Sequence, residues 1–201
     1  MSPSLSDPLL VGGRLAIDFC NAPSPRGRFT WEELLHFLLT TRIISAERSG
    51  ELLALPEADS QTAGALLSKA QRLQVALQAA FAAIVARESV SRASVEPINQ
   101  ILGITEGHDE LVQEGGKWRL EFVAHEGGLD WLLAAIARSA AEIIAEGASA
   151  RLRICANPSC GLFFYDTSRT KKRRWCSMAR CGNRHKVAAF SRRHSAAKRP
   201  S

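Results

Sequence analysis

The sequence lacks the features that mark a membrane or secreted protein. Its 201 residues contain no apolar run near the roughly 20 residues that a membrane-spanning helix needs. The N-terminus, MSPSLSDPLLVGG, has no basic head followed by an apolar stretch, so we expect no secretion signal. A chain with 46% hydrophobic and 23% charged residues is typical of a soluble globular protein. We therefore expect a cytoplasmic protein, in which thiols stay reduced.

The common signatures of catalysis are also missing. The chain has no phosphate-binding loop, no nucleophile elbow and no dinucleotide-binding fingerprint. His36, His108 and His125 are scattered along the chain, which favours surface or structural roles. Asp18 and Asn21 could face a cleft, or they could stabilise a turn through hydrogen bonds to the backbone. The sequence therefore predicts no catalytic residue and a protein that is not an enzyme.

Acidic residues are almost absent from the C-terminal quarter. Residues 150–201 contain fourteen Lys or Arg and one acidic residue, Asp166, for a net charge of +13. Residues 1–149 carry a net charge of −7. An acidic body with a basic tail favours a polyanionic partner for the tail, and a solvated basic surface is the simpler alternative. The same division predicts two domains, residues 1–149 and 150–201.

The N-terminal domain is expected to be α+β, mostly helical with a small sheet. Leu15, Ile17 and Phe19 alternate with smaller or polar residues and predict a buried strand over residues 13–21. The stretch ELVQEGGKWRLEFVAH predicts a hairpin around Gly115 and Gly116.

Five helices are expected from hydrophobic spacing and capping residues. They are one opened by a Thr30–Glu33 capping box, one after Ser45 that ends before Pro56, one from Ser60 to about Arg92, one over Val95 to Leu102, and one from an Asp130 cap to Gly147.

Four of the five cysteines form two C-x4-C pairs in the basic tail. Cys155 and Cys160 make the first pair, and Cys176 and Cys181 the second, with fifteen residues between the pairs. Four thiolates suit tetrahedral Zn²⁺ and leave no open coordination position, which predicts one structural zinc ion per chain. A disulfide or a redox switch is the alternative. Cys20 stands alone and is expected to be a small buried hydrophobe.

The spacing within the tail predicts a treble-clef-like zinc finger. Residues 157–159 are expected to form the turn of the first pair. The stretches LFFYD and KRRWC are expected to be strands around the loop TSRTK. A continuous α-helix would separate the second pair by about 140°, so the chain must break there. Gly182 is expected in a left-handed conformation, with Asn183 capping a new helix.

Two stretches of the chain carry a resemblance to known families. RICANPSCGLFFYDTSRTKKRRWCSMARCGNRHKVAAF resembles the bacterial CGNR zinc-finger family, whose motif stands here at residues 181–184. GGRLAIDFCNA resembles the opening of the ABATE domain and departs from it at Ala22, where threonine is usual. The resemblance implies a stress-related transcription regulator whose zinc finger binds DNA.

The basic residues of the tail are the candidate nucleic-acid contacts. Val187, Phe190 and His194 are expected to face inward, and Trp175 and residues 163–165 to form a core around the zinc. The candidate contacts are Arg169, Lys171, Lys172, Arg173, Arg174, Arg180, Arg184, Lys186, Arg192 and Arg193.

Duplex DNA is the favoured partner, so the leading hypothesis is a DNA-binding transcription regulator. Its body would sense a small-molecule effector or form a homodimer. The alternatives are an RNA-binding module, an enzyme of unknown activity in the body that the finger tethers, and a protein–protein adaptor.

Overall fold

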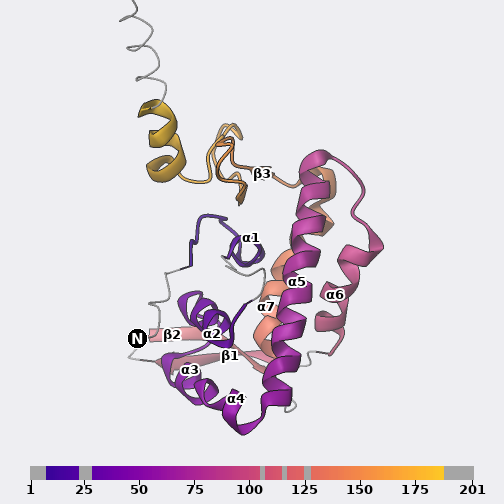
Figure 1. The fold of residues 1–201 in the computed structure, drawn as a ribbon, viewed down its shortest axis with the longest axis vertical. Coiled ribbons are helices and arrows are strands. Elements are labelled where there is room, and N and C mark those ends of the chain that lie inside the picture. The colour runs from indigo at the N-terminus through magenta and orange to yellow at the C-terminus, as the bar shows by residue number, and fades with distance from the viewer. Residues whose placement is uncertain (1–7, 23–28, 105–106, 115–116, 125–127, 188–201) are drawn as a thin grey trace, which may run out of the picture.

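A helical body carries a small C-terminal region at one end (Figure 1). The computed structural model describes residues 8–22, 29–104, 107–114, 117–124 and 128–187. The body helices are α1 (Leu15–Asn21), α2 (Trp31–Thr40), α3 (Ala46–Leu53), α4 (Leu55–Ala58), α5 (Ser60–Ala86), α6 (Arg92–Ile104) and α7 (Trp131–Glu146). Strands β1 (Gly107–Glu114) and β2 (Lys117–Ala124) lie between α6 and α7, and the tail contains β3 (Leu152–Ile154), β4 (Phe163–Tyr165) and a π-helical turn, Met178–Gly182.

The body core is built around the long helix α5. Helices α1, α6 and α7 pack along it, and α7 runs beside it in Figure 1. The apolar faces of α2, α5 and α7 are buried, with Phe37, Leu77 and Ile136 at 0–1% exposure. The α+β class is confirmed, with a mostly helical body and a small sheet. Within the described residues, no helix combines the length and apolar character needed to cross a membrane.

The strand predicted for residues 13–21 is wrong, because this segment is helix α1. Its buried side chains are Ala16, Ile17, Phe19 and Cys20, which is the i, i+1, i+3, i+4 spacing of a helical face. The alternating pattern of Leu15, Ile17 and Phe19 does not include Ala16 and Cys20, which are also buried. The buried side chain of Gln74 donates hydrogen bonds to the carbonyls of residues 19 and 22 at the end of α1, both at 3.2 Å.

The other helix predictions hold, with shifts at several ends. The capping box formed by Thr30 and Glu33 is present, and Ser45 caps α3, which ends before Pro56. Helix α5 ends at Ala86, earlier than predicted, because Arg87 adopts a left-handed conformation with φ 61°.

Helices α6 and α7 differ from prediction in how they begin. Helix α6 starts at Arg92, before the predicted residue, and contains Pro97 in its interior. Helix α7 follows Asp130 and ends at Gly147 as predicted, but the Asp130 side chain makes no capping hydrogen bond. It binds the Lys69 ammonium instead, at 2.6 and 2.7 Å.

The predicted hairpin is confirmed by antiparallel pairing of β1 with β2. The register runs from Gly107 opposite Ala124 to Glu114 opposite Lys117. The predicted turn at residues 115–116 lies outside the described residues.

The start of the tail is joined to the body through α1. The Asn21 side chain donates to the Phe163 carbonyl at 2.7 Å and accepts from the Phe163 amide at 3.0 Å. The Tyr165 amide donates to the Gly12 carbonyl at 2.7 Å. Leu152 and Tyr165 belong to the body's apolar core. We call this contact between residues 12–21 and β4 the seam.

Candidate metal centre and basic surface

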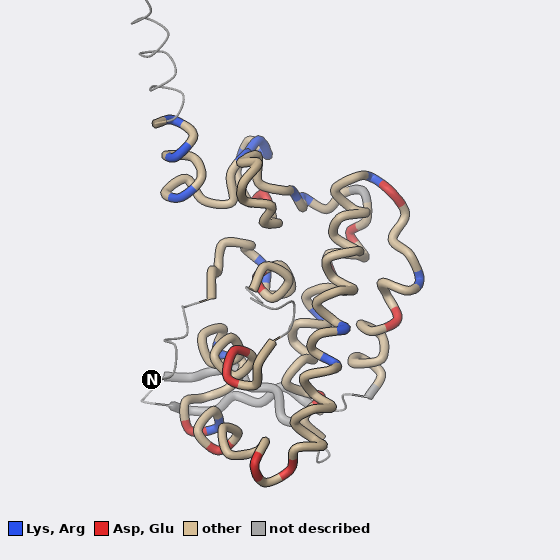
Figure 2. Tube along the Cα trace, in the orientation of Figure 1, with Lys and Arg blue, Asp and Glu red and all other residues tan. Residues whose placement is uncertain are grey.

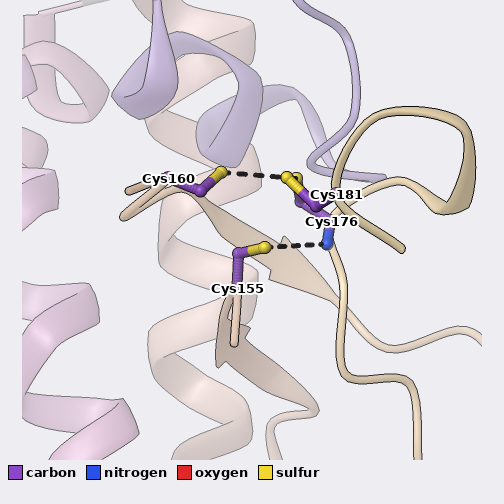
Figure 3. A group of neighbouring side chains, drawn as sticks. All are labelled: Cys155, Cys160, Cys176 and Cys181. Carbon is purple, nitrogen blue, oxygen red and sulfur yellow. Dashed lines mark hydrogen bonds between the residues drawn. The ribbon is translucent and has the colours of Figure 1, made fainter. Parts of the chain in front are cut away.

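The four predicted zinc ligands converge on one point (Figure 3). The sulfur atoms of Cys155, Cys160, Cys176 and Cys181 all lie within 4.8 Å of one another. Two sulfur pairs are 3.6 and 3.8 Å apart. A tetrahedron with Zn–S bonds of about 2.3 Å has edges of about 3.8 Å, so this spacing fits a four-thiolate zinc site. All four cysteines are free thiols, which the disulfide alternative does not accommodate.

The first cysteine pair is held by the predicted tight turn. The Cys160 amide donates to the Asn157 carbonyl at 2.9 Å, and the Ser159 amide donates to the Asn157 side-chain oxygen at 3.2 Å. The Asn157 side-chain amide also reaches the second pair, donating to Cys181 Sγ at 3.5 Å. This hydrogen bond lowers the pKa of the Cys181 thiol. Asn157 therefore both shapes the first turn and favours a thiolate in the second.

The second pair lies where the chain breaks, as predicted, and Ser177 makes the break. Ser177 is extended, and its hydroxyl accepts from the Arg180 amide at 3.4 Å. Its carbonyl accepts from the amides of Cys181 and Gly182 at 3.0 and 3.1 Å. The resulting π-helical turn continues directly into helical residues 183–187. This wider turn aims Cys181 back toward Cys176.

The predicted roles of Gly182 and Asn183 are wrong. Among the described residues, Gly182 is not one of the positive-φ glycines, and Asn183 is helical with φ −67° and ψ −41°. Because Gly182 has no side chain, the side chains of Met178 and Trp175 can lie close to its backbone. A Cβ at this position would lie 2.6 Å from Met178 Sδ and 3.3 Å from Trp175 Cδ1.

The strand pairing in the tail also differs from the prediction. Strand β4 is part of LFFYD, but it pairs antiparallel with β3, which precedes the first cysteine pair. Residues 172–176, which include the predicted second strand, form no strand. Two backbone amides tie this stretch to the first pair: the Ala156 amide donates to the Arg174 carbonyl at 2.8 Å, and the Cys176 amide donates to Cys155 Sγ at 3.5 Å. The first turn therefore closes the hairpin, since its flanks Leu152–Ile154 and Phe163–Tyr165 are in register.

Asp166, the lone acidic residue of the tail, organises the loop that follows β4. It is fully buried. One carboxylate oxygen accepts from the Ser168 amide and hydroxyl at 3.0 and 2.6 Å. The other accepts from the Arg173 amide at 3.0 Å and lies 3.2 Å from Arg153 Nε. Burial opposes ionisation, but these contacts outweigh it and hold the pKa of Asp166 below its usual value. Its isolation among so many cations was the signal that sequence reasoning missed.

Arg173 has internal partners that set it apart from the other candidate contacts. Its guanidinium donates to the Trp175 carbonyl at 2.8 Å and to the Cys176 carbonyl. It also lies over the Phe164 ring, 4.8 Å from the centroid. Arg173 is half-buried, and it links the loop to the cysteine cluster.

Seven of the other candidate contacts have exposed side chains. Figure 2 shows basic residues on the terminal helical segment and on the neighbouring loop, at the same end of the molecule. Arg192 and Arg193 lie outside the described residues. The exposed set, which we call the basic surface, is Arg169, Lys171, Lys172, Arg174, Arg180, Arg184 and Lys186.

The aromatic residues of the tail divide between two cores. Phe164 is fully buried against the cysteines, and Trp175 packs on the same cluster. Phe163 and Tyr165 point the other way, into the body, because alternate residues of a strand face opposite sides. The predicted aromatic core around the zinc is therefore confirmed for two residues and wrong for two. Val187, predicted to face inward, is 66% exposed. Phe190 and His194 lie outside the described residues.

The polar residues of α1 have structural partners. Asp18 accepts a hydrogen bond from the Gly12 amide at 2.7 Å, and burial raises its pKa to about 6. Asn21 is bound to the backbone of Phe163. Cys20 is 4% exposed, as expected of a small hydrophobe, and burial raises the pKa of its thiol to about 12. This geometry favours the hydrogen-bonded alternative over a cleft.

Four converging thiols in a basic C-terminal region define a zinc-finger protein with one structural zinc. Family models match both parts of the chain: residues 151–194 match the CGNR zinc finger, and residues 13–147 match ABATE, described as "Putative stress-induced transcription regulator". The chain belongs to the ABATE family, because that model covers most of its length. A search of curated proteins found no match.

Proposed function

We propose that this protein is a cytoplasmic DNA-binding transcription regulator whose zinc finger docks on duplex DNA. The observation that carries the proposal is the basic surface, seven exposed cations fixed to one zinc-bound scaffold. Membership of the ABATE family, whose description names transcription regulation, supports it. Residues 1–149 and 150–201 are proposed as the sensing or dimerising part and the DNA-binding part.

The distribution of charge supports docking at one end of the molecule. Basic residues concentrate on the finger, and the segment that contains α4, at the far end, carries acidic residues (Figure 2). Phosphates would attract the finger and repel the far end, which orients the protein as it approaches DNA. The zinc ion has a structural role here, since four thiolates fill its coordination positions and leave none for a substrate. The body's effector or dimer partner would act by changing how often the DNA-competent state is populated.

The salt dependence of duplex binding tests this proposal. Each phosphate neutralised contributes about −0.9 to the slope of log K against log salt. A variant that changes Arg169, Lys172, Arg184 and Lys186 to Gln should weaken binding and flatten the slope by about 3 to 4. Changing four basic residues of the body to Gln, Arg48, Arg72, Arg92 and Arg138, is the matched control. Equal slopes for the finger variant and the wild type, with zinc retained, would contradict the proposal.

Selection from a randomised duplex pool separates DNA from RNA. It is made at about 150 mM salt with single-stranded RNA as competitor. An enriched motif that RNA does not displace supports the regulator. Displacement by RNA would replace DNA with an RNA partner, because the same cations would serve both backbones.

A further inference from the structure

A cavity of about 910 Å³ lies between the body and the zinc finger. Its body side is formed by the end of α5 with the turn after it, residues 84–90, and by Ile144 near the end of α7. Its finger side is formed by residues 150–154 and by the loop from Lys171 to Arg174. Figure 1 shows the end of α5 beside β3. Small-molecule sites commonly have volumes of about 300–1,000 Å³, so this cavity has the size of a ligand site.

The charged residues that line the cavity are mostly cationic. Two carboxylates line it, Glu88 and Asp166. Asp166 is fully buried and already bound by Ser168, Arg173 and Arg153, so it offers little to a ligand. The cations, contributed by both sides, are Arg87, Arg151, Arg153, Lys171, Arg173 and Arg174.

Four of these cations are available to a ligand. Arg153 and Arg173 have internal partners: Arg153 also donates to the Lys171 carbonyl at 2.7 Å. The side chains of Arg87, Arg151, Lys171 and Arg174 are exposed, and Arg174 also lies over the Trp175 ring, 5.2 Å from its centroid. They come from both sides of the cavity, so one anion could bridge body and finger.

Two of the cationic residues have an unusual, left-handed backbone conformation. Arg87 has φ 61° and Lys171 has φ 52°, a conformation that favours glycine. Among the described residues, Arg42 is the one other non-glycine residue with positive φ, and it does not line the cavity. A helix end in this conformation usually carries glycine, yet α5 ends here in a long cationic residue that lines the cavity.

The cavity also has an apolar wall, formed by Ile84, Val85, Val90, Ile144 and Ile154. Ile154 is 44% exposed, although it is a large aliphatic side chain on a short strand. A phosphodiester backbone offers small sugar C–H groups between its phosphates, whereas an amphipathic organic anion carries one apolar moiety large enough to cover such a wall. We propose that this cavity binds a small organic anion, with a carboxylate or phosphate on the cationic rim and an apolar moiety against the wall.

The position of the cavity indicates whether its ligand raises or lowers the affinity for DNA. This direction of effect rests on the proposed function. Lys171 and Arg174 belong both to the cavity and to the basic surface. An anion bound to them neutralises charge that the phosphates of DNA would otherwise meet. The ligand therefore lowers DNA affinity, and DNA lowers ligand affinity by the same factor.

Binding of the fluorescent anion 1-anilinonaphthalene-8-sulfonate to the full zinc-loaded protein tests the site, because this probe combines a sulfonate with an apolar ring system. We expect saturable binding of one probe per chain. The double variant Arg87→Gln and Arg151→Gln should raise Kd roughly tenfold or more, since two charge-assisted contacts are lost. Arg138→Gln, an exposed change outside the cavity lining, is the control and should leave Kd unchanged. Equal Kd values for the wild type and the double variant would overturn the proposal.

Two further titrations test the apolar wall. Ile154→Thr keeps a β-branched, exposed residue on β3 and should weaken probe binding severalfold by removing apolar contact. Inorganic phosphate should compete far more weakly than the probe binds, because it cannot use the wall. Phosphate binding as tight as that of the probe, or an unchanged Kd for Ile154→Thr, would overturn the assignment of an amphipathic anion.

Duplex binding separates this site from the DNA surface. Without the probe, the Arg87→Gln, Arg151→Gln protein should bind duplex DNA within about twofold of the wild type, and saturating probe should weaken wild-type binding several-fold. A loss of DNA affinity as large as that of the fourfold finger variant would make Arg87 and Arg151 contacts of DNA and not of a separate ligand, and would overturn the proposal. Because the probe titration contains no DNA, it decides the ligand site even if the protein binds no duplex.

Discussion

The body and the zinc finger reach a folded state by different means. Among the described residues, the body core contains thirty buried side chains, whereas the finger cluster contains four, three of them cysteines. Burial of one large apolar side chain contributes about 1.5–3 kcal/mol, so Phe164 cannot hold the finger together by itself. Structural zinc contributes about 10–16 kcal/mol in comparable peptides. Apolar burial therefore stabilises the body, and metal binding stabilises the finger.

The hairpin β3–β4 belongs to both regions. Leu152 and Tyr165, which are opposite each other in the pairing, pack in the body core, and Phe164, opposite Arg153, packs on the cysteines. The hairpin is also bound to the Gly12 carbonyl and to the Asn21 side chain. We therefore expect that the fold of the tail depends on zinc only after β4, and not from residue 150 onward.

Removal of one ligand breaks the finger and should have the largest effect. Cys176→Ser should abolish zinc binding and unfold residues 167–187, because three thiolates bind zinc far more weakly than four. The helices of the body and the β3–β4 hairpin should persist. Zinc content, far-UV circular dichroism and limited proteolysis measure these three outcomes.

Cys20→Ala is the matched control, since it removes a thiol that lies outside the cluster. It should retain one zinc per chain. Zinc retention by Cys176→Ser would refute the four-cysteine site, and loss of the hairpin with the finger would refute the division at β4.

Prediction from sequence succeeded where chemistry is tied to spacing. Two C-x4-C pairs suffice to predict a tetrahedral site, because few ligand sets satisfy Zn²⁺. The capping box at Thr30 and the hairpin around residues 115–116 follow from equally local rules. Helix α1 could not be predicted from such local rules. Its seven residues are too few to establish a period, and tertiary contacts such as those of Gln74 decide its conformation.

The candidate nucleic-acid contacts show a second limit of sequence reasoning. Composition places Arg173 among the other cations, but two backbone carbonyls and the Phe164 ring hold its guanidinium in the fold. Asp166 likewise looks like a stray charge in the sequence and is the buried centre of the loop. Such roles depend on which residues meet in space, and spacing along the chain does not encode them.

A substitution at the seam tests how strongly the body and the zinc finger are joined, and it should change stability less than the loss of a zinc ligand does. Asn21→Asp removes the donor to the Phe163 carbonyl and places a carboxylate against it. We expect the free energy of unfolding to fall by about 1–3 kcal/mol, the usual cost of an unsatisfied buried polar group. Faster hydrogen exchange at β4, with zinc retained, would locate the loss at the seam.

Asn99→Asp makes the same chemical change at an exposed site on α6 and serves as the control. It should alter stability by less than about 0.5 kcal/mol. Equal effects of the two changes would mean that the Asn21 hydrogen bonds contribute little to joining body and finger.

The smallest expected effect is a pH dependence at the seam. Asp18 holds the Gly12 amide, and the Gly12 carbonyl in turn accepts from β4. Burial raises the pKa of Asp18 from 3.8 to about 6. Between these pH values the folded state keeps a proton that the unfolded state releases, so the stabilising contribution is complete below about pH 4 and is lost as pH rises through 6.

Asp18→Asn should remove this dependence, because asparagine keeps the acceptor for Gly12 and cannot ionise. Discounted for solvent screening, the variant should gain about 1 kcal/mol on the wild type between pH 5 and pH 7.5. Urea unfolding of both proteins at each pH measures the difference, and the acid sensitivity of the zinc site cancels because it is common to both. A difference that does not change with pH would show that Asp18 ionises as readily in the folded protein as in the unfolded chain, and that burial at the seam leaves its carboxyl open to water.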